Sequence, residues 1–359
     1  MVSHSPTVVA LSGGVDSAVA ALLLLREGAA VEGLYMQNWE DDDGYCTSAQ
    51  DFQDARSVAR ELGIPLHRVD FSTDYRARVF QYFLDEYTAG RTPNPDVLCN
   101  REIKFGLCRA YAQRLGAKRF ATGHYARLQD GSLHKGLDVN KDQSYFLHAV
   151  RRSQFDDVAF PIGDLPKSEV RGLARKAGLP VFDKPDSTGI CFIGERPFRE
   201  FLGQFLGEHA GPIETPAGEQ VGAHRGLAFH TLGQRAGLAI GGRRGGESLA
   251  WYVAGKDGVR NALIVVQGHD HPGLQSVALQ ASGLNWLCEP PNASFEANVK
   301  LRYRQEDQAA TILPRADGTI EINLHEPQRA VTPGQFVVMY RDTQCLGGGV
   351  IERTHTERF

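Results

Sequence analysis

The sequence predicts an α/β protein with an N-terminal doubly wound parallel sheet, a small central domain and a C-terminal all-β barrel. In the first half, short apolar β runs alternate with helical stretches, which is typical of a parallel sheet with helical crossovers. From Gly211 glycine becomes frequent, and from Trp251 short β runs alternate with turn signals, which favours a barrel. The 359 residues suit two or three domains, which we place at residues 1–200, 201–275 and 276–359.

The individual elements follow from these patterns in chain order. Strands are predicted at Thr7–Leu11, Val31–Met36, Leu66–Asp70 and Arg119–Thr122. Helices are predicted at Ser17–Glu27, Gln50–Leu62, Thr73–Tyr87, Ile103–Leu115, Pro166–Ala177 and Pro197–Leu206. Asp317-Gly318 predicts a hairpin turn between Ala310–Pro314 and Thr319–Leu324. Two long loops, Gln37–Ala49 and Gly90–Glu102, interrupt the first half, and long ordered loops often carry function.

Composition excludes several classes of protein. The chain is 42% hydrophobic and 23% charged, which argues against a disordered chain. Lys plus Arg number 39 against 43 Asp plus Glu, so a uniformly basic surface is excluded while a local basic groove is not. We find no apolar run of about 18 residues and no signal peptide, so we expect a cytoplasmic protein with no membrane partner. The six cysteines form no Cys-x-x-Cys pair, and we assign no residue as a ligand of a resident metal.

The sharpest motif is Ser12-Gly13-Gly14-Val15-Asp16-Ser17, between an apolar strand and a helix. Backbone N–H groups and the positive helix end meet there, which favours an anion, and the glycines allow a close approach. Asp16 would repel a phosphate, so its predicted roles are holding Mg²⁺ or capping the helix. This string resembles the PP-loop of ATP pyrophosphatases. The resemblance implies ATP and Mg²⁺ as cofactors, cleavage of ATP to AMP and pyrophosphate, and an adenylated substrate from which a nucleophile displaces AMP.

Two further strings each carry a cysteine. Arg91–Asn100 contains two prolines, which predicts a rigid loop, and places Asp96 three residues before Cys99, with Lys104 nearby to lower the thiol pKa. Asp186–Ile193 places Cys191 in a glycine-containing loop. Taken alone, each cysteine fits a structural role better than a reactive one. Together with an ATP pyrophosphatase loop, the pair allows sulfur delivery, in which one thiol bears a persulfide and the other resolves it as a disulfide.

The whole chain resembles one family, the bacterial tRNA-specific 2-thiouridylases, which thiolate the wobble uridine. The strings that carry the resemblance are the PP-loop, Gly33–Met36, Asn38–Asp42, Tyr45-Cys46, Gly90–Phe105, Ala121–Tyr125, Asn140–Leu147, Asp186–Glu195, His230–Arg235, Arg302–Arg304 and Pro333–Gln335. They occur in order along nearly the full length. His230 is a small departure, at a position where the family often has Tyr or His.

The resemblance implies a role for each matching residue. The ATP site would comprise Ala10, Leu11, Ser12, Gly13, Gly14, Val15, Asp16, Ser17, Met36 and Gly123. The tRNA contacts would comprise Asn94, Pro95, Asp96, His124, Lys141, Asp142, Gln143, Arg302, Tyr303 and Gln335. Asp96 would be the general acid/base for the uracil, Cys191 the persulfide carrier and Cys99 its partner nucleophile. A sulfur-relay protein would load Cys191, residues 1–200 would hold the chemistry, and the two later domains would contact tRNA.

Local positive charge is compatible with an RNA partner despite the acidic total, although an ordinary solvated strand face would show the same alternation. Ala297–Arg304 alternates, which predicts a strand with Lys300, Arg302 and Arg304 on a basic solvent face and Tyr303 in the core. Three rivals stay open: an amide-forming ATP pyrophosphatase, a sulfurtransferase for another tRNA nucleotide, and an RNA-binding protein without catalysis. Direct attack by the persulfide and release of hydrosulfide by Cys99 are both compatible with the sequence.

Overall fold

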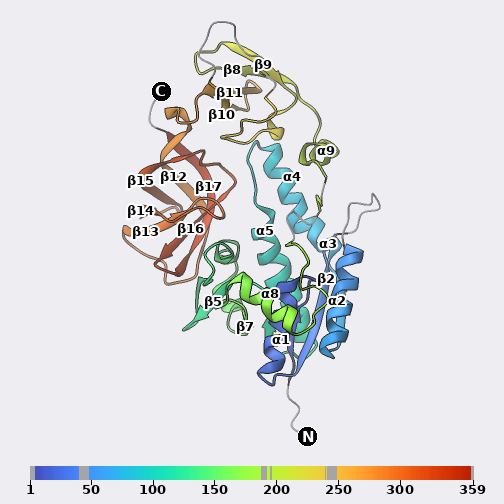
Figure 1. Cartoon of the computed structure of the whole chain (residues 1–359). Helices are drawn as coiled ribbons and strands as arrows, with labels where there is room; N and C mark the ends of the chain where they lie inside the picture. The colour runs from blue at the N-terminus through green and yellow to red at the C-terminus, as the bar shows by residue number, and fades with distance from the viewer. Residues whose placement is uncertain are drawn as a thin grey trace.

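The computed structural model describes residues 5–39, 48–186, 192–194, 196–238, 240 and 249–356. Figure 1 shows three parts: an α/β domain that carries the N-terminus, a small sheet (β8 to β11) at the opposite end, and a β-barrel beside both. Of the predicted long loop Gln37–Ala49, residues 40–47 lie outside the described part, and so does Cys191.

The α/β domain is built on a five-stranded parallel sheet, as predicted. The strands are β1 (Thr7–Ala10), β2 (Val31–Gln37), β3 (Leu66–Asp70), β4 (Arg119–Ala121) and β7 (Val158–Ala159). Their order is β3-β2-β1-β4-β7, so the chain winds outward in both directions from β1. The carboxyl ends of β1 and β4 therefore form the topological switch point, where sheets of this kind bind ligands.

Helices cover both faces of this sheet because successive strand residues point to opposite sides. Val9 and Tyr35 face a core that contains residues of α1 (Val15–Arg26), α2 (Ser48–Leu62) and α8 (Lys167–Lys176). Val8 and Leu34 face a second core, which is larger and rich in aromatic rings. Its helices are α3 (Ser72–Tyr75), η1 (Arg76–Phe80), α4 (Gln81–Thr88), α5 (Pro95–Leu98), η2 (Cys99–Cys108) and α6 (Arg109–Arg114).

The second part of the predicted loop Gly90–Glu102 is helical, which corrects the prediction. Residues 95–114 form one continuous helical run that begins at Pro95. Proline is well suited to the first turn of a helix, because its missing N–H has no partner there and its φ is already helical. Only residues 89–94 form the connecting loop.

A hairpin of the α/β domain extends the C-terminal sheet. β5 (Ala126–Gln129) pairs with β6 (Ser132–Lys135), and β6 pairs with the last strand of the chain at His134 and Gln344. The short helices α7 (Ser144–Leu147) and η3 (Arg152–Gln154) follow. The α/β domain and the barrel therefore share one hydrogen-bonded sheet.

The central part contains a small four-stranded sheet. Its strands are β8 (Gly211–Glu214), β9 (Gln220–His224), β10 (Trp251–Asp257) and β11 (Ala262–Gln267), in the order β10-β11-β8-β9. The helices around it are α9 (Phe198–Gly203), η4 (Leu227–Phe229) and η5 (Pro272–Leu274). Ile213, Val253, Leu263 and Val265 are fully buried and form the centre of its core.

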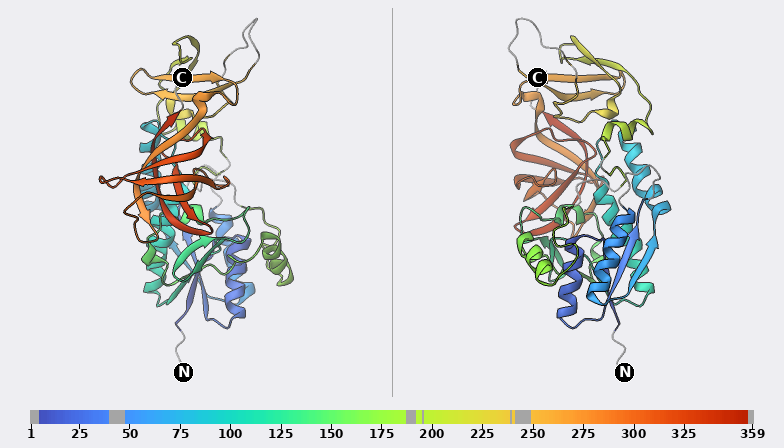
Figure 2. Two further views of the ribbon diagram at one scale, coloured as in Figure 1. Left: turned by 90° about the vertical axis from the view of Figure 1, so that its left-hand side faces the viewer. Right: turned by 45° about the vertical axis from the view of Figure 1, so that its right-hand side comes forward.

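The C-terminal part is a closed β-barrel, as predicted. Its strands are β12 (Gln275–Trp286), β13 (Phe295–Lys300), β14 (Gln308–Pro314), β15 (Ile320–Arg329), β16 (Phe336–Arg341) and β17 (Gln344–Thr356). Pairing of β12 with both β15 and β17 closes the ring, which Figure 2 shows from two further sides. The predicted hairpin at Asp317-Gly318 is confirmed, since Pro314 pairs with Ile320.

The predicted strand Ala297–Arg304 is wrong in its second half. β13 ends at Lys300, and the chain then turns, with Arg304 at φ +63°. Lys300 is mostly buried and lies 3.6 Å from Asp142 and 3.9 Å from Asp307, so it is committed to carboxylates. The row of three exposed cations therefore does not form.

Candidate active site

The loop between β1 and α1 forms a backbone cradle at the switch point. Gly13 has φ +79°, and a Cβ there would lie 2.2 Å from the carbonyl oxygen of Asp51 in α2. Only glycine fits such a position. Gly14 is the N-cap of α1 and has no side chain with which to cap it, which leaves first-turn N–H groups for an anion. The geometry suits a phosphate group.

The two serines of the loop have different surroundings. Ser17 is buried, donates to the carbonyl oxygen of Gly14 at 3.1 Å and accepts from the backbone N–H of Ser12 at 3.2 Å. Ser12 is exposed, and its hydroxyl lies 3.2 Å from that of Ser17. Ser17 therefore fixes the shape of the loop, while Ser12 is open to a ligand.

The other predicted nucleotide residues surround this cradle. A Cβ at Gly123, just after β4, would lie 2.6 Å from the backbone nitrogen of Ser17, so β4 approaches the loop at van der Waals distance. Ala10 and Leu11 have buried apolar side chains, and the backbone N–H of Leu11 is already bonded to the carbonyl oxygen of Leu34. Met36 is half-buried against the aromatic core at the end of β2.

Asp16 lies in an ion pair that the sequence did not predict. Lys167, the first residue of α8, places its Nζ 2.7 and 2.9 Å from the two carboxylate oxygens of Asp16. The Tyr125 hydroxyl donates to the same carboxylate at 2.8 Å. The side chain of Asp16 does not cap α1, because the N-cap position of this helix is Gly14. Its negative charge in the first turn of α1 is instead balanced by a lysine of α8, a helix that lies far away in the sequence but packs against α1.

Asp96 lies in the first turn of the helical run 95–114. Burial raises the pKa of this carboxyl above its ordinary value, and the positive charge of Lys104 offsets part of the rise. A raised carboxyl pKa favours proton exchange with a substrate. Cys99 lies one turn further on and is 4% exposed. Asp96 and Cys99 are therefore carried on one rigid element.

Both later domains clamp the loop that precedes this helix. Lys256 of β10 donates to the carbonyl oxygen of Gly90 at 2.8 Å. Gln335 donates to the carbonyl oxygens of Thr92 and Pro93 at 2.8 and 3.2 Å, and Thr92 donates its N–H to Pro333. Asn94 and Pro95 therefore enter the helix from a loop whose position depends on the central sheet and the barrel.

Cys191 lies outside the described residues, but its neighbour Phe192 is placed. Phe192 is fully buried and contacts Trp39 at 5.6 Å, Phe80 at 5.0 Å and Phe83 at 4.9 Å between ring centroids. Cys99 belongs to the same core. Among the remaining cysteines, burial raises the pKa of Cys108 and of Cys345 to about 12, which supports structural roles for these two.

Several residues expected to contact tRNA are committed to internal contacts. His124 is 6% exposed and bonds to Thr122 at 2.6 Å, and burial holds its pKa well below the ordinary value. Asp142 is 3% exposed and accepts from the N–H groups of Gly136 and Ser144. Gln143 accepts from the N–H of Tyr125 at 3.0 Å. Contacts of these residues with RNA stay a prediction.

Lys141 and Tyr303 also have partners within the chain. Lys141 is paired with Asp186 at 2.7 Å. Tyr303 packs on Phe146, with 4.4 Å between ring centroids. Arg302 and Gln335 line a cavity of about 420 Å³, and the Gln335 amide also donates to the loop at Thr92 and Pro93.

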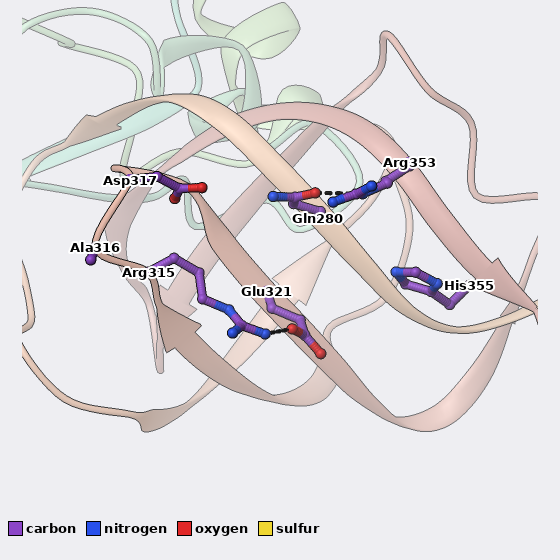
Figure 3. Close-up of a pocket in the computed structure, with 7 residues that line it drawn as sticks. All are labelled: Gln280, Arg315, Ala316, Asp317, Glu321, Arg353 and His355. Atoms are coloured by element: carbon purple, nitrogen blue, oxygen red, sulfur yellow. Dashed lines mark hydrogen bonds and ion pairs between the residues drawn. The ribbon is translucent and has the colours of Figure 1, made fainter.

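This cavity lies where all three parts of the molecule meet. It is bounded by Thr92 of the α/β domain, by 231–234 of the central part and by 301, 302, 305, 329–332 and 335 of the barrel. A second cavity, of about 480 Å³, lies on the outside of the barrel (Figure 3). There Arg315 is paired with Glu321, and Arg353 donates to Gln280 at 2.5 Å. The junction cavity is the one that reaches, at Thr92, the loop before the helix carrying Asp96 and Cys99.

Two absences concern only the part of the chain that the structure describes. No helix there is long and apolar enough to span a bilayer. No group of three His, Cys, Asp or Glu side chains there is arranged to hold a metal ion.

Comparisons with known families match all three parts. The family described as "tRNA methyl transferase HUP domain" matches residues 6–195. The "tRNA methyl transferase PRC-barrel domain" matches residues 199–267, and the "Aminomethyltransferase beta-barrel domain" matches 276–351. The fold and the loop thus define a HUP-domain protein with two appended β domains.

Relatives from bacteria match nearly the whole chain. A tRNA-specific 2-thiouridylase MnmA of Dichelobacter nodosus is 54% identical and covers 97% of this chain and 94% of its own length. A tRNA-specific 2-thiouridylase MnmA of Actinobacillus succinogenes is 52% identical, and the match covers 96% of this chain and 91% of that protein. The chain belongs to the family of tRNA-specific 2-thiouridylases. A solved 4-thiouridine synthetase–RNA complex is more distant, at 21% identity and TM-score 0.38 over 56% of this chain and 50% of its own.

Proposed function

We propose that this protein is a tRNA 2-thiouridylase. It adenylates the C2 oxygen of the wobble uridine (position 34) and transfers sulfur from a cysteine persulfide, giving 2-thiouridine, AMP and pyrophosphate. The observation that carries the proposal is similarity to 2-thiouridylases along the whole chain, which includes both β domains and not only the α/β domain. Its place of action is the cytoplasm, where tRNA is available.

The cradle of Gly13, Gly14 and the α1 N-terminus would hold the phosphates of ATP, because it presents uncapped N–H groups without side-chain bulk. When bound, ATP supplies the adenylyl group that makes the uracil oxygen a good leaving group. Mg²⁺ would be held jointly by these phosphates and a carboxylate of the loop, since this ion is usually held by one or two carboxylates together with substrate phosphates. Asp16 is the carboxylate of the loop, and it would exchange Lys167 for the ion.

Asp96 exchanges a proton with the uracil, which its burial and raised pKa favour. Asn94 and Pro95 contact the same base at the start of the helix. Cys191 carries the terminal sulfur delivered by a sulfur-relay protein, and Cys99 is its partner. Whether the persulfide attacks C2 directly or Cys99 first releases hydrosulfide, the two cysteines end as a disulfide that is reduced before the next turnover.

The junction cavity supports RNA binding between the three parts. Arg302 and Gln335 line it, and about 420 Å³ is enough for a splayed nucleotide. The wobble base must leave its stack to reach the loop at the switch point, so base flipping is part of the proposal.

One assay tests this proposal. It contains the protein, ATP, Mg²⁺, a persulfide as the sulfur donor and unmodified tRNA with a wobble uridine, and measures both pyrophosphate and thiouridine. We expect RNA-dependent pyrophosphate and thiolation at the wobble position. Cys191→Ser should abolish thiolation yet keep pyrophosphate release, whereas the matched control Cys108→Ser should keep both.

Other outcomes favour the rivals. Thiolation of another nucleotide would favour a different tRNA sulfurtransferase. Pyrophosphate release that depends on ammonia rather than tRNA would favour an amide-forming enzyme. RNA binding without any pyrophosphate would favour a protein that binds RNA without catalysis.

A further inference from the structure

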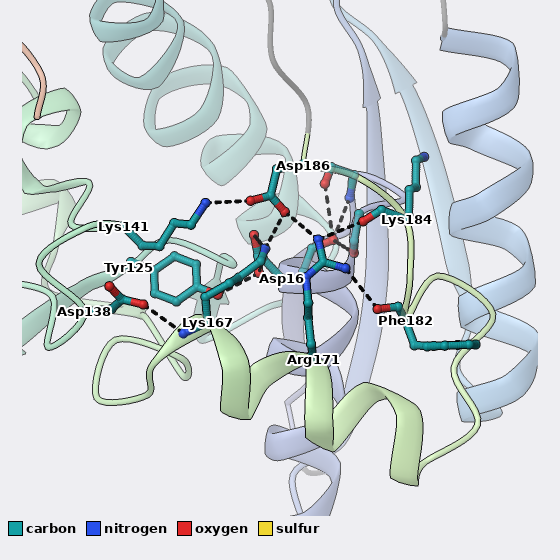
Figure 4. A network of polar contacts seen from close by, with 12 residues as sticks. Asp16, Tyr125, Asp138, Lys141, Lys167, Arg171, Phe182, Lys184 and Asp186 are labelled. Carbon is teal, nitrogen blue, oxygen red and sulfur yellow. Dashed lines mark hydrogen bonds and ion pairs between the residues drawn. The ribbon is translucent and has the colours of Figure 1, made fainter.

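Three side-chain cations converge on Asp186 beside the phosphate loop (Figure 4). Lys141 lies 2.7 Å from one carboxylate oxygen, and Lys167 and Arg171 lie 2.7 and 3.0 Å from the other. Burial by itself raises the pKa of Asp186, but hydrogen bonds from Lys141 and Lys167 outweigh this and bring it to about 2. Asp186 is therefore an anion at neutral pH.

Lys167 links this cluster to the loop directly. Its side chain is 11% exposed, and its Nζ bonds both to Asp16 in the first turn of α1 and to Asp186. The backbone N–H of Lys167 donates to Asp138 at 2.9 Å, which fixes the start of α8. One buried ammonium group is thus shared between the loop and Asp186.

The chain that leads to Asp186 is also held against the loop. Lys184 bonds to the Gly13 carbonyl oxygen at 3.2 Å and to Asp51 and Asp54 of α2 at 2.8 and 2.5 Å. Arg171 donates to the carbonyl oxygens of Phe182 and Lys184 at 3.1 and 3.0 Å. Asp186 therefore occupies a fixed position close to an uncapped helix N-terminus.

The charges in this cluster fit a phosphate better than a carboxylate. Lys141, Lys167 and Arg171 carry three positive charges; Asp186 supplies one negative charge to all three, and Asp16 supplies a second one to Lys167 alone. A di- or triphosphate on the loop offers several negative charges and more acceptor oxygens, and Arg and Lys bind phosphate strongly.

We propose that Asp186 is an internal substitute for a nucleotide phosphate: it holds Lys141, Lys167 and Arg171 in the nucleotide-free chain and yields them when a polyphosphate binds the loop. This inference rests on the proposed function, because it takes ATP as the ligand of the loop. Asp186 and the phosphates then compete for the same cations. Competition of this kind lowers the apparent affinity for the polyphosphate. The apparent affinity is the intrinsic affinity multiplied by the fraction of chains in which Asp186 does not hold the cations.

The test measures the dissociation constants of ATP with Mg²⁺ and of inorganic pyrophosphate by calorimetry, on the full chain without RNA. Asp186→Asn keeps the shape of the side chain and removes its charge, and it should tighten binding by about three- to tenfold. Asp164→Asn is the matched control, since it removes an equal charge from a carboxylate whose side chain is 76% exposed and which lies 3.7 Å from Arg127, outside the cluster. It should change the constants by less than about twofold.

Lys167→Met identifies the cation involved. It should weaken pyrophosphate binding by about tenfold or more, and it should shrink the gain from Asp186→Asn in the double variant, because the two residues act through one contact. An undiminished gain in the double variant would show that Lys167 is not the shared group and would overturn the inference as stated.

A measurement on the unaltered protein covers the case in which Asp186→Asn fails to fold. Hydrogen exchange should slow in residues 12–17 and quicken in 182–186 when pyrophosphate binds, because the second segment loses its ion pairs. Slower exchange in both segments would overturn the inference, as would unchanged or weaker binding by folded Asp186→Asn. If the unaltered protein binds neither ATP nor pyrophosphate, the proposed function fails together with the inference. If the unaltered protein binds ATP and pyrophosphate but the predicted changes in hydrogen exchange and in the dissociation constants are missing, the inference is wrong and the proposed function stands.

Discussion

The side-chain amide of Gln335 donates a hydrogen bond to the carbonyl oxygen of Thr92 at 2.8 Å, although 243 positions separate the two residues. The same amide reaches the carbonyl oxygen of Pro93 at 3.2 Å. A residue expected to contact tRNA thus also ties the barrel to the loop that enters the helix carrying Asp96 and Cys99. Through these bonds, the barrel holds the loop from which that helix begins.

Gln335→Ala should therefore loosen the loop even without RNA. Loss of the two hydrogen bonds leaves buried carbonyl groups unsatisfied, at a cost of about 1–2 kcal/mol. We expect faster hydrogen exchange in residues 90–96 of the RNA-free protein and thiolation slower by about tenfold. Gln335→Glu should do the same or worse, because a carboxylate cannot donate to carbonyl oxygens. Unchanged exchange in both variants would mean that Gln335 acts only on RNA.

Gly123→Ala should damage the phosphate loop by steric means. The added Cβ would lie 2.6 Å from the backbone nitrogen of Ser17 and 2.7 Å from the carbonyl carbon of Asp16, and backbone atoms cannot rotate away. We expect ATP affinity to fall by about tenfold or more, because the cradle must shift. Calorimetric titration with ATP measures this change.

Gly172→Ala is the matched control for this substitution. Gly172 lies exposed within α8, and an added Cβ would meet nothing within 4 Å. Alanine there should stabilise the fold by roughly 0.5–1 kcal/mol and leave ATP affinity unchanged. Equal loss of affinity in both variants would show that the packing of β4 against the loop is not the cause.

Much of the architecture could be predicted because it is written in local patterns. The alternation of strands and helices predicts the parallel sheet of the α/β domain. Asp317-Gly318 predicts a hairpin of the C-terminal barrel. The helix start at Pro95 was missed although its signal is present: proline at the first helical position followed by an acid in the first turn. Two prolines were interpreted as loop residues when one of them begins a helix.

The ion pairs of the site could not be predicted from the sequence. Lys167 meets Asp16 only because α8 packs against α1, and a separation of 151 positions leaves no periodic signal. Arg302 and Tyr303 were placed on a strand by alternation, but β13 ends at Lys300, whose charge is buried against Asp142 and Asp307. Tertiary contacts decided both cases.

Asp96→Asn should lower thiolation and raise stability at neutral pH. Thiolation should fall by about 10²–10⁴-fold if Asp96 exchanges a proton with the base. Burial raises the pKa of Asp96 in the folded chain above its ordinary value of 3.8. The folded state therefore keeps this proton up to a higher pH than the unfolded state does. The free energy of unfolding therefore falls as pH rises through this window, and the amide removes that loss.

Urea unfolding of Asp96→Asn and the unaltered protein, from about pH 4 to about pH 7, measures this difference, which should grow with pH. Asp130→Asn is the control, since Asp130 is exposed in the turn between β5 and β6 at φ +50°, a conformation that Asn also adopts. A difference that stays constant with pH would contradict burial of the charge as the cause.

Lys256 gives the opposite dependence on pH. Burial lowers the pKa of its amine from 10.5 to about 8, while the amine donates to the carbonyl oxygen of Gly90. Between these two values the unfolded chain binds more protons than the folded one, so the free energy of unfolding rises with pH. Lys256→Met should remove this rise and also free the start of the clamped loop.

Urea unfolding at about pH 7 and about pH 10 should show the unaltered protein gaining stability relative to Lys256→Met, whereas the exposed control Lys118→Met should show no such change. An equal response of both variants would mean that the Lys256 amine keeps its proton in the fold and that the clamp is a charged contact.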